Sequence, residues 1–144
     1  MVLPNTDMMA SNKYDPFYKS ELTTILVVAD MQKSKAFYID KLGAELYREY
    51  GGTSTVIKFL DNWLLLVTPG GPTEDKPDTA FVVPENRKAV SHSFTIRVQD
   101  CHKSYEALKA KGISFVTPPK DWGSEIRCFF NDPDGHLFEI SEAK

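Results

Sequence analysis

Cysteine is scarce in this sequence and long apolar runs are missing. Only Cys101 and Cys128 occur in 144 residues, too few for a disulfide framework and typical of a reducing compartment. We expect both to be buried free thiols. The longest uncharged apolar run, residues 63–67, is far short of a membrane span. These absences favour a soluble cytoplasmic protein without a membrane partner.

A surplus of basic residues is also absent. The net charge is −3, and lysine and arginine are scattered along the chain. A protein that grips a phosphate backbone needs clustered positive charge, so nucleic acid is not an expected partner. Residues 1–20 lack the basic start and apolar stretch of a secretory signal. We interpret them as an N-terminal extension to a single domain, residues 21–142.

The first half of that domain has a simple order of elements. A run rich in β-branched residues predicts a strand, after which Asp30 caps a helix that ends at Gly43. A two-residue hairpin is predicted at Asp61–Asn62. The predicted strands cover residues 22–29, 44–50, 54–60 and 63–68, which makes the unit βαβββ.

The same order returns in the second half. Asp100 caps a predicted helix over residues 101–111 that ends at Gly112, and strands are predicted over residues 91–99, 113–116, 125–130 and 136–141. Val28-x-Asp30 matches Val98-x-Asp100 at an offset of 70, and the last strands match at 74. The sequence therefore predicts a duplication, with module one at 21–68, a linker at 69–90 and module two at 91–142.

The linker is long for a connection inside a compact domain. It holds four prolines between Pro69 and Pro84. Two interpretations stay open: a surface crossover between the modules, which we favour, and a lid over a pocket.

Two passages resemble a known family. The opening ILVVADMQKSKAFYIDKLGAELY and the ending FFNDPDGHLFEISE are similar to the glyoxalase, bleomycin-resistance and extradiol-dioxygenase group, the vicinal oxygen chelate superfamily. The resemblance covers about residues 21–142. It implies an α+β fold in which two tandem βαβββ modules form a curved, partly open mixed β-barrel with helices outside. It also implies a homodimer and, in catalytic members, a divalent metal ion.

By resemblance, four strand positions would supply the metal ligands. They fall on Thr23, Leu65, Ser93 and Glu139 of this chain, and only Glu139 is a strong ligand. The inherited metal site therefore looks degenerate. His92 lies one residue before an expected position, on the opposite face of a regular strand unless a bulge turns it back. We expect His102 and His136 to be solvated and poor ligands.

The alternation of side chains along strands assigns the concave face. Arg97 on this face suits a carboxylate or phosphate group, although a structural pair with Glu139 or an exposed strand residue is the alternative. Tyr47 and Trp122 are candidate rim aromatics. Glu139 is the predicted catalytic residue, and Glu139 and His92 are the predicted metal ligands if a metal binds. The predicted ligand-binding residues are Thr23, Trp63, Leu65, Ser93, Thr95, Arg97, Arg127 and Phe129.

Two functional hypotheses follow. The first is a protein that binds or sequesters a small organic molecule without a working metal site. The alternative is a divalent-metal-dependent lyase or isomerase of the glyoxalase type, in which Glu139 acts as metal ligand or general base. Dioxygenase chemistry is less favoured because it wants two histidines and a carboxylate on one face. A pure interaction module stays open as a third class.

Overall fold

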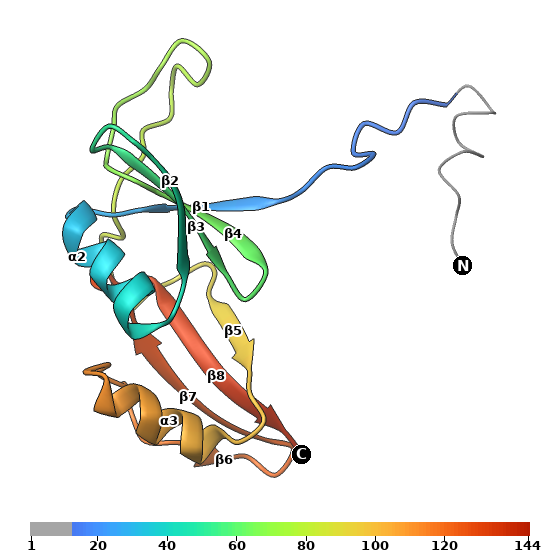
Figure 1. Ribbon diagram of the computed structural model, residues 1–144, viewed down its shortest axis with the longest axis vertical. Helices are drawn as coiled ribbons and strands as arrows, with labels where there is room; N and C mark the ends of the chain where they lie inside the picture. The colour runs from blue at the N-terminus through green and yellow to red at the C-terminus, as the bar shows by residue number, and fades with distance from the viewer. Residues whose placement is uncertain (1–12) are drawn as a thin grey trace.

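The computed structural model describes residues 13–144, so residues 1–12 of the predicted extension lie outside it. Two four-stranded mixed sheets carry their helices on the same side, and the segment before the first strand stretches away from the body (Figure 1). The α+β class and the two tandem modules are as predicted, and the two sheets are open and not closed into a barrel. In the described part of the chain, no helix is long and apolar enough to cross a membrane.

The first sheet has the strand order β1-β4-β3-β2. The strands are β1 (Thr23–Val27), β2 (Glu45–Tyr50), β3 (Ser54–Phe59) and β4 (Asn62–Val67). β1 runs parallel to β4, and Ile25 pairs with Leu65 in their register. Because side chains alternate across a strand, Leu26 and Leu66 turn to the helices and are buried, while Ile25 stays 43% exposed on the other face.

The second sheet repeats this topology as β5-β8-β7-β6. Its strands are β5 (Phe94–Arg97), β6 (Lys120–Asp121), β7 (Glu125–Asn131) and β8 (Leu137–Ala143). β5 runs parallel to β8, and Thr95 pairs with Glu139. This pair is the counterpart of Ile25 and Leu65 at the offsets that the sequence predicted. The registers of both modules therefore agree.

Each module begins its helix with an aspartate cap, as predicted. The Asp30 carboxylate accepts the Lys33 N–H at 3.1 Å, and Asp100 accepts the Lys103 N–H at 3.0 Å. The helices then differ. α3 (Cys101–Ala110) is a regular α-helix, whereas α2 (Met31–Lys35) continues into the π-helix η1 (Ala36–Lys41). Wider π-turns are rare in helices, and nothing in the sequence pattern predicted this one.

Two local predictions are wrong. The hairpin before β4 turns at Leu60 and Asp61, which have positive φ angles of 49° and 61°, and not at Asp61–Asn62, because Asn62 already pairs with Phe59. The strand predicted over 113–116 is reduced to one bridge between Phe115 and Phe130. The counterpart of β2 is instead the short β6, which follows two prolines that have no N–H to donate to a ladder.

One continuous core joins the two modules. The Phe138 ring of β8 stacks on Phe94 at 4.9 Å and on Phe130 at 5.3 Å between ring centroids, and it meets Tyr38 of module one at 6.0 Å. Buried apolar side chains from β1, β3, β4, β7 and β8 contribute to this layer. Since both helices pack on this side of the sheets, the opposite, concave faces remain accessible to a ligand.

The turn at residues 131–136 ties module two to module one. The buried Tyr38 hydroxyl donates to Asp132 Oδ2 at 2.6 Å, and the Ala29 N–H donates to Asp134 Oδ1 at 2.9 Å. Burial raises the pKa of Asp132, and burial together with the neighbouring Asp132 charge raises the pKa of Tyr38 well above 10.0. We call these contacts the inter-module clasp. The DPDG segment, residues 132–135, therefore has a structural role in joining the modules.

Candidate functional site

The predicted site residues divide between the two concave faces. Thr95, Arg97, Arg127, Phe129 and Glu139 come together on the second sheet, where Thr95 and Phe129 flank Glu139 in the strand register. Thr23, Trp63 and Leu65 lie on the first sheet, and Ser93 lies in the loop before β5. The chain thus gathers five of the predicted residues and leaves the others apart.

Glu125 links the two arginines of the second sheet. Its Oε1 accepts a hydrogen bond from Arg127 Nη1 at 2.9 Å. Its Oε2 accepts one from the Ser141 hydroxyl at 2.6 Å and one from Arg97 Nη1 at 3.4 Å. Arg97 Nη1 also donates to the Ser141 hydroxyl oxygen at 2.7 Å. The Ser141 hydrogen bond, followed by the two guanidinium groups, holds the pKa of Glu125 below its usual value. This carboxylate therefore stays ionised and orients both arginines.

Glu139 occupies the centre of the same face and is only 8% exposed. Its Oε1 accepts the Thr95 hydroxyl at 2.7 Å, and its Oε2 lies 3.7 Å from Arg127 Nε. A buried carboxylate is costly unless it is paired or hydrogen-bonded, and these two neighbours satisfy it. The ion pair is made with Arg127, whereas Arg97, the partner that the sequence suggested, binds Glu125 and Ser141 instead.

Aromatic rings flank the Arg127 guanidinium. Its Cζ lies 5.3 Å from the centroid of the Trp122 ring and 5.8 Å from that of Phe129. Such cation–π contacts hold a guanidinium in place while leaving its edge free to donate. The side chains of Arg97 and Arg127 are 65% and 36% exposed. Two positive groups with spare N–H donors and two aromatic surfaces therefore share one accessible face.

The first sheet presents a different surface. Trp63 Nε1 donates to Glu21 at 3.1 Å, and the Trp63 ring meets Tyr47 edge-on at 5.0 Å with Lys58 Nζ 5.1 Å from its centroid. Thr23 is exposed and Leu65 is half-buried. Apart from the hydroxyl of Thr23, the predicted positions on this face offer only apolar or aromatic surface.

Of the two histidines that we expected to be solvated, His102 is exposed as predicted and His136 is not. His102 is exposed on α3, and His92 is exposed in the loop before β5, where it lines a cavity. His136, expected to be solvated, is half-buried and its Nε2 lies 2.8 Å from the Val27 carbonyl oxygen. That prediction is wrong because the 131–136 turn packs against the end of β1, which sequence offsets within one module cannot indicate.

The donors at the family's metal positions do not fit a metal ion. They comprise one carboxylate, two hydroxyls and a leucine, divided between two sheets, and both oxygens of Glu139 already face Thr95 and Arg127. Among residues 13–144 there is no group of three or more His, Cys, Asp or Glu side chains that could hold one. Both cysteines are buried and free, and burial raises the pKa of Cys128 to about 12, which disfavours a thiolate ligand.

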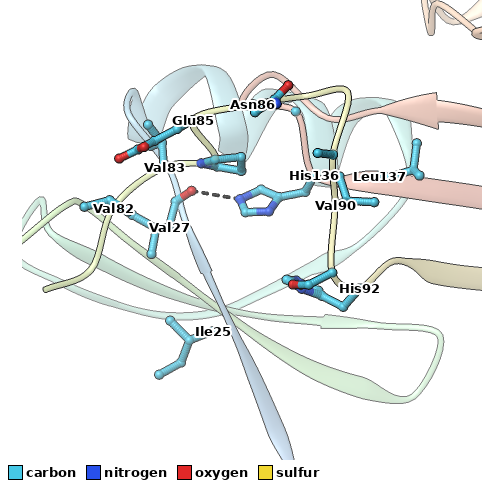
Figure 2. Close-up of a pocket in the computed structure, with 14 residues that line it drawn as sticks. Ile25, Val27, Val82, Val83, Glu85, Asn86, Val90, His92, His136 and Leu137 are labelled. Atoms are coloured by element: carbon cyan, nitrogen blue, oxygen red, sulfur yellow. Dashed lines mark hydrogen bonds between the residues drawn. The ribbon is translucent and has the colours of Figure 1, made fainter. Parts of the chain in front are cut away.

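The linker is a crossover between the two modules, and part of it also covers a cavity. It crosses from β4 to β5, with Gly70 and Phe81 paired in an antiparallel bridge. Its residues 82–86, 89 and 90 then line a cavity against β1 and the start of β8 (Figure 2).

Sequence reasoning missed several residues of these sites. Glu125 could have been found, because it alternates with Arg127 and Phe129 on β7 and so faces the same side. Ser141 follows Glu139 by the same rule. The cavity residues of the linker carry no comparable signal, since no period governs an irregular segment.

Comparisons with known proteins agree with this fold. A probable lactoylglutathione lyase of Vibrio parahaemolyticus is 30% identical over 141 residues, which cover 85% of this chain and 90% of the relative. A glyoxalase/bleomycin resistance protein/dioxygenase structure from Nocardioides has a TM-score of 0.70 at 22% identity, covering 96% of this chain and 91% of that one. A mutant of the fosfomycin resistance protein FosX of Listeria monocytogenes, solved with Mn(II) and a dihydroxypropylphosphonic acid, has a TM-score of 0.60 at 22% identity, covering 84% and 88%.

The family model of the same group matches most of the chain. It spans residues 22–140, which include both sheets, both helices and the inter-module clasp. The chain therefore belongs to the glyoxalase/bleomycin resistance protein/dioxygenase superfamily.

Proposed function

We propose that this protein binds a small organic molecule carrying an anionic group on the concave face of the second sheet, and that it does so without a metal ion. The observation that carries the proposal is the pair of exposed guanidiniums, Arg97 and Arg127, held in place by Glu125 beside two aromatic rings. Guanidinium groups bind carboxylate and phosphonate oxygens through paired N–H donors. The phosphonate in the FosX complex is an anion of this kind.

Benzoate is a suitable first probe because it joins a carboxylate to an aromatic ring. We expect isothermal titration calorimetry to detect its binding, and Arg97→Gln and Arg127→Gln each to weaken that binding about tenfold, since hydrogen bonds to charged groups contribute about 1.5–3 kcal/mol. Arg48→Gln is the matched control, because Arg48 lies on β2 of the other sheet. Undetectable binding, or equal binding by all three variants, would contradict the proposal.

A lyase or isomerase is the second candidate, favoured by one observation. Glu139 is buried, and the Thr95 hydroxyl fixes one of its oxygens, as a positioned general base requires. The Vibrio relative carries the name of a lyase. The test is the divalent metal content of the purified protein. Stoichiometric metal that is lost in Glu139→Gln and kept in the control Glu142→Gln would favour this candidate and would count against metal-free binding.

The oligomer we propose is a homodimer. Apolar side chains are exposed along the segment that precedes β1, with Phe17 at 78% and Leu22 at 88%, and both concave faces are open. Burial against a second copy would remove this surface from water. Light scattering after size exclusion would measure a mass twice that of the chain, whereas a monomer at micromolar concentration would contradict this assignment.

We also propose a cytoplasmic location. Two buried free cysteines suit a reducing compartment. Fractionation of the producing cells would place the protein in the soluble cytoplasmic extract if the proposal holds, and in the medium or envelope if it fails.

A further inference from the structure

The cavity beneath the linker is separate from the arginine face of the second sheet. Its volume is about 460 Å³, within the usual range of small-molecule pockets, about 300–1,000 Å³. Ile25 and Val27 of β1 and Val82 and Val90 of the linker are among the apolar residues that line it (Figure 2). Neither Arg97 nor Arg127 reaches it.

The linker is held in place over this cavity. Arg87 Nη2 donates to the Pro133 carbonyl at 2.8 Å. The Arg87 side chain also lies so close above Gly135 that a Cβ there would come within 2.8 Å of it. These contacts fasten the segment around Arg87 to the 131–136 turn. The cavity is thus formed before a ligand arrives, which lowers the entropic cost of binding.

The charges around the cavity disfavour an anion. No lysine or arginine is among its lining residues, and the titratable side chains there are the carboxylate of Glu85 and the imidazoles of His92 and His136. Arg87 is the nearest guanidinium along the linker, and it is directed to the Pro133 carbonyl. A negative ligand would lose its hydration here without gaining a partner charge.

His136 supplies a directed polar atom. Because the Val27 carbonyl can only accept, the His136 Nε2 at 2.8 Å must carry the proton of that hydrogen bond. In the neutral ring the other nitrogen, Nδ1, is then an acceptor, and it makes no hydrogen bond to a described residue. It is also accessible, since the described residues contain no buried side-chain nitrogen or oxygen without a partner. Figure 2 shows the ring between Val27 and Val90.

We propose that this cavity is a second binding site, which takes a neutral, largely apolar molecule with one hydrogen-bond donor, such as a phenol. The valine and isoleucine walls contact its apolar body, and the hydroxyl donates to His136 Nδ1. The class of ligand is therefore the opposite of that proposed for the arginine face.

Three naphthalene probes of similar shape test this inference by fluorescence titration at neutral pH. 2-Naphthol has the donor, 2-methylnaphthalene replaces it by a methyl group, and 2-naphthoate carries a negative charge. We expect 2-naphthol to bind about fivefold more tightly than 2-methylnaphthalene, the difference that one net hydrogen bond makes, and 2-naphthoate not to bind at this site. Saturating benzoate should leave 2-naphthol in place. With saturating benzoate present to occupy the arginine face, equal binding of the three probes, or no binding of 2-naphthol, overturns the proposal.

Variants locate the probe. Val90→Trp fills the cavity from the linker side and should abolish 2-naphthol binding, whereas Val116→Trp, an exposed valine outside the cavity, should leave it unchanged. His136→Phe should remove the preference for 2-naphthol over 2-methylnaphthalene. If that variant does not fold, the probe series on the unaltered chain and Val90→Trp still decide. Unchanged 2-naphthol binding by folded Val90→Trp would overturn the site.

Discussion

The two modules share a backbone and differ in the chemistry of their concave faces. Ile25 and Leu65 form the central parallel pair of the first sheet, and Thr95 and Glu139 form the same pair in the second. The helix-facing positions are mostly apolar in both, as Leu26, Leu66, Phe138 and Ile140 show. Core packing therefore constrains one face of each sheet in the same way, whereas the central pair of the other face is apolar in one copy and polar in the other.

The core offers the largest test of this comparison. Phe138 and Leu64 are counterparts on β8 and β4, and both are buried. Phe138 meets rings from both modules, so Phe138→Ala should lower the free energy of unfolding by about 3–5 kcal/mol. Leu64→Ala should lower it by about 2–3 kcal/mol. Urea denaturation measures both, and an equal or larger loss for Leu64→Ala would mean that Phe138 does not join the modules.

The inter-module clasp comes next. Tyr38→Phe removes the hydroxyl that Asp132 accepts, and should cost about 1–3 kcal/mol in unfolding free energy. Because the pKa of Tyr38 is higher in the folded chain than its usual 10.0, folding stability falls as pH rises above that value. The variant should lack this alkaline loss. Tyr105→Phe in α3 is the control, and it should retain the pH dependence, measured by denaturation at several alkaline pH values.

The helix caps should have smaller and equal effects. Asp30→Ala and Asp100→Ala each remove one carboxylate that accepts an N–H of the first turn, which costs about 1 kcal/mol. Asp40→Ala, an exposed aspartate in η1, is the matched control. The two losses should add in the double variant because the sites are separate. A much larger loss at Asp30 would indicate that the π-helix depends on its cap.

Surface ion pairs should matter least in both modules. Lys35 pairs with Glu49 in module one and Lys144 with Asp121 in module two. We expect Glu49→Gln and Asp121→Asn to leave the urea midpoint at neutral pH nearly unchanged, since exposed pairs contribute little. The hydrogen bond from Lys144 lowers the pKa of Asp121, so any contribution is present above its usual pKa and disappears as pH falls. A clear destabilisation by either substitution at neutral pH would contradict this ranking.

The fold was largely predictable because its signals are local. Asp30 and Asp100 followed by amphipathic runs predict the helices, and alternation predicts the strands and their faces. The offsets between the modules correctly identified Leu65 and Glu139 as equivalent positions. The registers confirm this, because Leu65 pairs with Ile25 in the first sheet as Glu139 pairs with Thr95 in the second. The prediction of a strand over residues 113–116 was wrong because β-propensity does not decide whether a neighbouring strand is within hydrogen-bonding reach.

The site was less predictable for a physical reason. Strand alternation correctly placed Thr95, Arg97 and Glu139 on one face, whereas the ion pair of Glu139 with Arg127 in place of Arg97 was not predicted. The contact of His136 with Val27, and the cover that the linker gives to the cavity, depend on how one module docks on the other. No periodicity within either module encodes that docking, so only a three-dimensional structure reveals it.

The Tyr38 hydroxyl and its acceptor Asp132 are separated by 94 positions along the chain. During synthesis, the helix that carries Tyr38 leaves the ribosome well before its acceptor exists, because translation proceeds at about 5–20 residues per second. Until the 131–136 turn emerges, module one has a polar group and part of its apolar layer without partners. Its final packing therefore waits for the end of translation, and nascent chains halted within the linker would be natural clients for chaperones.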